Sequence, residues 1–151
     1  MVRALKLFGC LSIAVLCLTG CSSEETLTCS MEDESSGVSM EQIVEMTFKD
    51  DKINKVKMTV NTKATDDTMK ENWDLIASSM DEQFDEKSSD GVSLNKDNDA
   101  DNHTYKVELS VDLDKATEDS LSEYGLDGIT DDDSTLEETK KEAEDSGFTC
   151  K

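Results

Sequence analysis

The sequence predicts an α+β domain in which an antiparallel sheet of about four to five strands carries one long and one or two shorter helices on one face. Three observations lead to this fold class. Apolar and polar residues alternate in several short runs, residues 66–87 instead repeat at helical steps, and the order along the chain is strands, helix, strands, helices. The chain contains no internal repeat at a fixed period.

The first half of the predicted sheet is a set of alternating runs. Apolar residues occupy every second position in 27–31, 44–48 and 56–60, and an acidic loop with a glycine (32–37) separates the first two. Residues 49–52 are predicted to be the turn of a hairpin, although the strongest turn signal, Asn-Gly, is absent.

The long helix is predicted over residues 66–87, with Thr65 as its N-cap. Its apolar residues fall at steps of three and four and form one stripe: Met69, Trp73, Ile76, Ala77, Met80 and Phe84. We expect this stripe, with Trp73 as its largest member, to pack on the sheet.

The C-terminal half is predicted as a loop over 88–102 with a short strand at 92–94, followed by the strand 105–113. A weaker helix is expected over 116–124, an acidic loop over 125–134, and a charged helix over 136–145 that Gly147 terminates. Residues 148–151 are expected to lie against the first strand.

The leading segment has the layout of an export signal. Arg3 and Lys6 precede an apolar run of about 12 residues, roughly 18 Å of helix, which is too short to cross a hydrocarbon core of about 30 Å. The run ends in Leu18-Thr19-Gly20-Cys21, which resembles the lipobox of bacterial lipoproteins. That resemblance implies that residues 1–20 are removed and that Cys21 becomes the lipidated first residue, with 21–26 as a short tether and 27–151 as the folded domain.

The charge balance limits the classes of molecule that the protein can bind. The chain has 15 basic and 36 acidic residues, a net charge of −21, and residues 21–151 alone carry −23 because the leader holds two basic residues and no acid. Such an acidic surface argues against nucleic acid as a partner, since a nucleic-acid site needs a positive footprint. The partner that the sequence does indicate is the membrane, through the lipid on Cys21.

The cysteines agree with export. Cys10 and Cys17 leave with the leader and Cys21 is modified, so Cys29 and Cys150 remain as an even pair. Outside the cytoplasm we expect this pair to form a disulfide that closes almost the whole domain. A metal-binding pair or a catalytic thiol is the alternative.

Taken together, these features resemble the YehR-like family of small bacterial lipoproteins. The residues that carry the resemblance are the lipobox, the early Leu27-Thr28-Cys29, the helix around Trp73 and the ending Gly147-Phe148-Thr149-Cys150-Lys151. The resemblance implies an α+β domain on the extracytoplasmic face of the cell membrane. Ser22 after the lipidated residue favours the outer membrane in a cell that has one.

One acidic stretch has the spacing of a calcium loop. Asp97, Asp99, Asp101 and Glu108 stand at positions 1, 3, 5 and 12 of such a loop. However, Asn102 replaces the usual glycine and the residues that follow alternate as a strand, so we expect a solvated turn, with weak cation binding as the alternative. The same expectation holds for the second cluster, Asp127 and Asp131 to Asp133.

The other candidates for chemistry are isolated. His103 has no second histidine or cysteine near it in sequence, so a zinc or catalytic role is not expected, and no cofactor is indicated. The six methionines after residue 21 are expected to fill the core instead of binding a soft metal: Met31, Met40, Met46, Met58, Met69 and Met80.

A lysine strip contrasts with the acidic remainder. Lys49, Lys55 and Lys57 fall on the solvent face of the predicted hairpin, where they are possible contacts to a membrane or an acidic envelope polymer. A solvated face is the alternative.

These observations favour a non-catalytic, membrane-anchored binding protein, because no set of nucleophile and base is visible. A weak extracellular calcium-binding module and a hydrolase with an unrecognised carboxylate pair remain the two alternatives.

Overall fold

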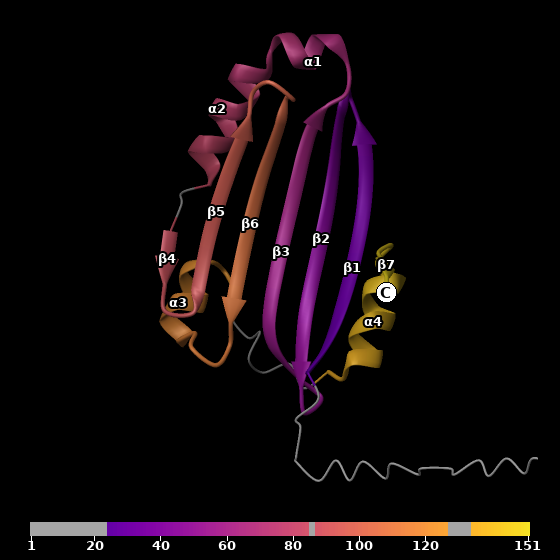
Figure 1. The fold of residues 1–151 in the computed structure, drawn as a ribbon, viewed down its shortest axis with the longest axis vertical. Coiled ribbons are helices and arrows are strands. Elements are labelled where there is room, and N and C mark those ends of the chain that lie inside the picture. The colour runs from indigo at the N-terminus through magenta and orange to yellow at the C-terminus, as the bar shows by residue number, and fades with distance from the viewer. Residues whose placement is uncertain (1–23, 85–86, 127–133) are drawn as a thin grey trace, which may run out of the picture.

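The computed structural model describes residues 24–84, 87–126 and 134–151, and the strands of this part form one antiparallel sheet (Figure 1). The strand order across the sheet is β4-β5-β6-β3-β2-β1-β7. The strands are β1 (Glu24–Ser35), β2 (Val38–Lys49), β3 (Lys52–Ala64), β4 (Lys87–Ser89), β5 (Val92–Asp99), β6 (Thr104–Asp112) and β7 (Thr149–Cys150). The described helices are α1 (Asp67–Glu71), α2 (Trp73–Gln83), α3 (Glu118–Glu123) and α4 (Leu136–Asp145).

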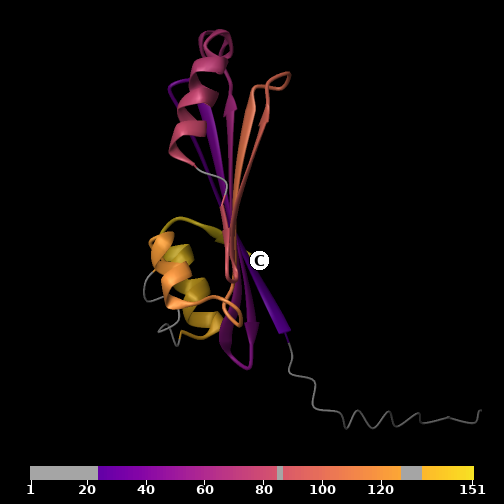
Figure 2. The same ribbon diagram turned by 90° about the vertical axis from the view of Figure 1, so that its left-hand side faces the viewer.

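The predicted α+β class is confirmed, but the described sheet has seven strands where about four to five were expected. Two of the additional strands, β4 and β7, have three and two residues. Segments this short have no periodicity that a sequence pattern could reveal. All four described helices lie on the same side of the sheet (Figure 2), as predicted.

Two tight turns connect the first three strands. Asp50 and Asp51 both have positive φ angles, 53° and 63°, as the two-residue turn between strands of right-handed twist requires. Ser36 and Gly37 connect β1 to β2 with φ angles of 53° and 77°. The predicted turn at 49–52 is therefore confirmed, whereas the predicted loop at 32–37 is wrong because β1 continues to Ser35.

The start of β1 also differs from the expectation. Residues 24–26, which the sequence assigned to a tether, pair with β2 through Glu24–Lys49 and Thr26–Thr47. The strand therefore starts three residues before Leu27.

The predicted long helix is interrupted. It breaks at Asn72, whose φ and ψ of −101° and 13° leave the helical region, so that α1 and α2 are separate. Asp66, and not Thr65, caps α1 by accepting a 2.7 Å hydrogen bond from the amide of Met69. The predicted apolar stripe nevertheless packs on the sheet, and Trp73 is only 2% exposed.

The C-terminal helices begin at capping boxes. The Thr117 hydroxyl accepts a hydrogen bond from the backbone amide of Ser120. The Thr135 hydroxyl accepts a hydrogen bond from the backbone amide of Glu138 in the same way. The predicted helix over 136–145 is confirmed in full as α4.

The apolar residues form two clusters under two groups of helices. One cluster, near α3 and α4, contains Leu27, Cys29, Met46, Phe48, Val56, Val92, Val111 and Leu121. The other, under α2, contains Ala64, Trp73, Ala77, Tyr105 and Val107. The expectation that the methionines fill the core fails for Met40 and Met58, which remain 39% and 40% exposed.

The predicted pairing of Cys29 with Cys150 is present as a disulfide with a Cα–Cα distance of 4.1 Å. β7 pairs with β1 at this point, and the backbones of Thr28 and Lys151 exchange two hydrogen bonds of 3.1 and 2.9 Å. The chain end thus lies against the first strand, as expected. In the described residues, no helix combines the length and apolar character needed to cross a bilayer.

Candidate functional site

The face of the sheet opposite the helices is covered by no described helix (Figure 2), and its side chains are almost entirely polar. We call it the open face. Because the strands pair in register, side chains of one face line up in rows across the sheet. The first row is Thr26, Thr47, Lys55 and Asp112, and the second is Glu45, Lys57, Ser110 and Ser93.

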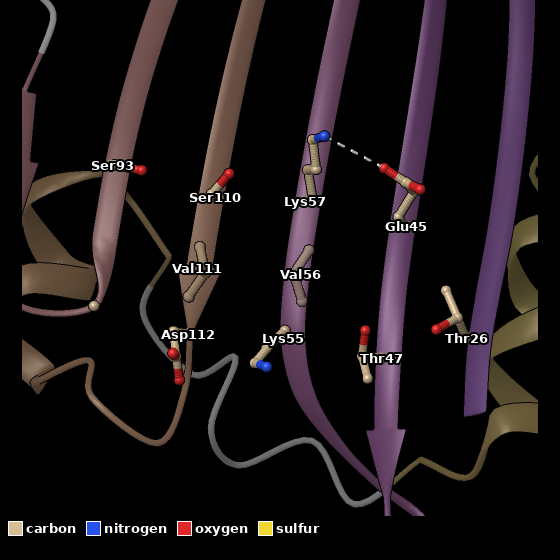
Figure 3. A pocket seen from close by; sticks show the side chains of 11 residues that line it. Thr26, Glu45, Thr47, Lys55, Val56, Lys57, Ser93, Ser110, Val111 and Asp112 are labelled. Atoms are coloured by element: carbon tan, nitrogen blue, oxygen red, sulfur yellow. Dashed lines mark ion pairs between the residues drawn. The ribbon is translucent and has the colours of Figure 1, made fainter. Parts of the chain in front are cut away.

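A hollow of about 540 Å³ lies over these two rows (Figure 3). We call it the trough. Short serine and threonine side chains form its two ends, lysines and carboxylates lie between them, and Gly91, Val56 and Val111 complete the lining. Its size is within the range of roughly 300–1,000 Å³ that is usual for small-ligand sites.

Ion pairs hold Lys57 in place. Its Nζ lies 3.7 Å from Glu45 Oε2 and 3.4 Å from Glu108 Oε2. The second carboxylate also binds Lys106 at 2.8 Å. The hydrogen bond from Lys106, with the charges of both lysines, lowers the pKa of Glu108 below its usual range and keeps this network charged.

Lys55 differs from Lys57 because its ammonium group has no carboxylate at ion-pair distance within the described part of the chain. Its neighbour Asp112 is instead bound by Lys115 at 2.6 Å. That hydrogen bond lowers the pKa of Asp112, with a smaller contribution from the charge of Lys55. The trough therefore contains one engaged and one unengaged ammonium group.

The small hydroxyl side chains of the trough are also unengaged. Among the described residues, none of the hydroxyl groups of Thr26, Thr47, Ser93 and Ser110 has a hydrogen-bond partner. Each hydroxyl can donate one hydrogen bond and accept others. The trough thus offers four donor–acceptor groups to a ligand.

The lysine strip predicted from the sequence is partly brought together here. Lys55 and Lys57 both line the trough, as Figure 3 shows. Lys49 lies at the end of β2, opposite Glu24 and outside the lining of the trough.

The segment with calcium-loop spacing, which we expected to be a solvated turn, is mostly a strand. Asp97 and Asp99 belong to β5, in a segment that the sequence assigned to a loop, and only Asp101 lies in the turn to β6. Asp99 accepts hydrogen bonds from the amide and the side chain of Asn102, which lower its pKa. Within the described ranges, no three acidic, histidine or cysteine side chains are grouped as a metal site.

The remaining candidates have structural surroundings or lie outside the described residues. His103 contacts Trp73 edge to face, with ring centroids 6.2 Å apart, at the turn where its φ is 51°. Cys21 and the cluster Asp127 and Asp131 to Asp133 lie outside the described residues.

Sequence reasoning missed most of the trough: Thr26, Thr47, Ser93, Ser110 and Asp112. The alternation of β1 and β2 contains the signal for two of them, because Thr26 and Thr47 are the neighbours of the buried Leu27 and Phe48. The residues of β5 and β6 join them only through the order of the strands.

Comparison with known proteins shows the fold alone. No family model and no curated protein matches the chain. The solved NMR structure of a protein from Streptococcus pneumoniae TIGR4 is similar, with a TM-score of 0.59 over 100% of this chain and 99% of the other. The two sequences are 15% identical, so this likeness supports the arrangement of strands and helices but no activity.

Proposed function

We propose that this chain is a lipid-anchored protein of the extracytoplasmic face of a bacterial membrane, similar to the YehR-like lipoproteins, and that it binds a partner on the open face of its sheet. The observation that carries the binding role is the trough. It unites an unengaged ammonium group and four unengaged hydroxyls on a sheet face that no described helix covers.

The anchoring role rests on the lipobox and on the position of Cys21. Only Ser22 and Ser23 separate Cys21 from the first residue of β1. A fully extended tether of this length spans roughly 10 Å, so a lipid on Cys21 holds that end of the sheet beside the bilayer. Glu24 pairs with Lys49, so the β2–β3 turn is at this same end. The α1 end points away from the bilayer.

Intact-mass analysis of natively expressed, detergent-extracted protein tests the anchoring role. We expect a chain that begins at Cys21, carries acyl groups, and is two hydrogens lighter through the Cys29–Cys150 disulfide. A Cys21→Ser variant is the control and keeps its leader, gains no acyl mass and retains the disulfide. A native protein that begins at Met1 without acyl groups contradicts anchoring.

Site-specific photo-crosslinking in intact cells tests the binding role. A photo-reactive amino acid replaces Ser110 in the trough or, as a matched control, Leu75, which is 73% exposed on α2. We expect adducts of higher mass from position 110 and none from position 75. Absence of adducts at 110, or equal adducts at both positions, contradicts a role of the open face.

A further inference from the structure

We propose that the ligand of the trough is an acidic polysaccharide, with Lys55 as the contact of its anionic group and the four trough hydroxyls as contacts of its sugar hydroxyls. This inference rests on the proposed function and names the ligand class of the same site.

The charge of the trough suits one anionic group at a time. Lys57 is bound by Glu45 and Glu108, and Asp112 is neutralised by Lys115, so Lys55 supplies the available positive charge. The net charge of −23 after residue 20 repels densely charged polymers such as nucleic acids. A hydroxylated polymer whose charges are widely spaced, so that one anionic group at a time meets Lys55, satisfies both conditions.

The hydrogen-bonding groups suit a ligand that both donates and accepts. Thr26 and Thr47 lie on one side of Lys55, and Ser93 and Ser110 lie on the other (Figure 3). Sugar hydroxyls, like those of the protein, donate and accept in turn. The described lining contains no aromatic side chain, which disfavours ligands that bind by stacking, such as nucleobases.

The length of the trough suits an extended chain. The lining reaches from Ser93 on β5 to Thr26 on β1 across β6, β3 and β2. Four spacings of about 4.8 Å between neighbouring strands amount to roughly 19 Å. A ligand that uses both groups of hydroxyls must therefore lie across the strands.

The position and length of the trough favour a polysaccharide over a lipid headgroup. Thr26 is two residues after Glu24, so the trough lies near the proposed anchor and within reach of either ligand. A single headgroup contacts one part of the lining at a time, whereas an extended polymer contacts the hydroxyls on both sides of Lys55.

Equilibrium binding of sparsely charged polygalacturonate, in which most carboxyl groups are methyl-esterified, to the natively processed protein in detergent tests this inference. Its fully methyl-esterified form is the ligand control, because it keeps the backbone and the free hydroxyls but loses the charge. We expect the charged polymer to bind at least about tenfold more tightly than the neutral one, as the loss of a charged hydrogen bond implies.

Two charge-neutralising variants locate the contact. Lys63 is on the same strand and the same face as Lys55 but lies outside the lining of the trough. We expect Lys55→Gln to weaken binding about tenfold and Lys63→Gln to change it less than about twofold. Equal losses in both variants, or no loss in Lys55→Gln, overturn the site.

Soluble competitors distinguish the two possible sources of the anionic group, which are a polysaccharide and a lipid headgroup. Galacturonate is expected to displace the polymer, and glycerol phosphate, which represents a lipid headgroup, is not. Stronger competition by glycerol phosphate overturns the polysaccharide in favour of the headgroup. If no polymer binds, this inference fails while acylation at Cys21 and crosslinking at position 110 still decide the proposed function separately.

Discussion

The hydroxyl of Tyr105 on β6 donates a 2.7 Å hydrogen bond to Oδ1 of Asp81 on α2. Lys96 on β5 reaches the same oxygen at 3.0 Å, so one carboxylate joins the helix to two strands. The hydrogen bond from the buried Tyr105, followed by that from Lys96, lowers the pKa of Asp81. This relationship makes the attachment of α2 dependent on pH.

We expect Tyr105→Phe to lower the stability of the domain at pH 7 and to lower it less at pH 3. A lowered folded-state pKa means that the contribution is present above the unfolded pKa of about 3.9 and disappears as the pH falls through the folded value. Urea denaturation at pH 7 and pH 3 measures the difference between variant and wild type.

Tyr124→Phe is the matched control for this experiment. In the described residues the Tyr124 hydroxyl is buried without a hydrogen-bond partner, so its removal is expected to cost little at either pH. A destabilisation by Tyr105→Phe that is equal at pH 7 and pH 3 contradicts the role of Asp81.

Removing the disulfide is expected to destabilise the domain strongly. Cys29 and Cys150 are 121 positions apart, and in the chain-entropy model closing such a loop contributes about 4–5 kcal/mol. Urea denaturation with and without reductant measures this term in the wild type. A Cys29→Ala/Cys150→Ala variant should have the same urea midpoint as the reduced protein and should not respond to reductant. A wild-type midpoint that is unchanged on reduction contradicts the stabilising role of the disulfide.

Gly91→Ala is expected to destabilise the domain more than Gly125→Ala does. Both glycines have positive φ angles, 73° and 69°, so both substitutions carry the left-handed penalty of roughly 1–2 kcal/mol. Only at Gly91 does a Cβ also meet backbone, including the carbonyl oxygen of Asp112 at 2.7 Å. Thermal melts of the two variants measure the difference, and equal melting temperatures contradict the close approach.

Calcium is expected to leave the melting temperature unchanged up to about 10 mM, the weak extracellular range. Asp99 is engaged by Asn102, and Asp97 pairs in register with Lys106 on the neighbouring strand. Differential scanning fluorimetry measures the melting temperature at each calcium concentration, with Mg²⁺ as the control. A saturable rise with calcium that Asp97→Asn abolishes contradicts our interpretation.

The parts of the fold that the sequence predicts are those with complete local signals. α4 has its capping threonine, its helical pattern and Gly147 in one stretch of chain, and the β2–β3 hairpin has alternation on both sides of a two-residue turn. These signals need no knowledge of the remainder of the molecule.

The parts that escape prediction depend on tertiary contacts. The second half of β5 has Lys96 and Asn98 on its helix-facing side, so its polar sequence resembles a loop. Their partners lie on α2, where Lys96 binds Asp81 and Asn98 accepts from the Trp73 indole at 3.1 Å. Similarly, the trough joins Thr26 to Asp112 through pairing across four strands, which no local pattern encodes.

The pairing of β7 with β1 makes disulfide formation depend on a late segment of the chain. Most strands pair with neighbours in sequence, but Cys29 on β1 finds its partner 121 positions later, in Cys150 on β7. A chain whose synthesis stops before Cys150 therefore retains a free thiol on its first strand. Thiol labelling would then distinguish chains that include Cys150 from those that do not, so the bond reports that synthesis has passed this residue.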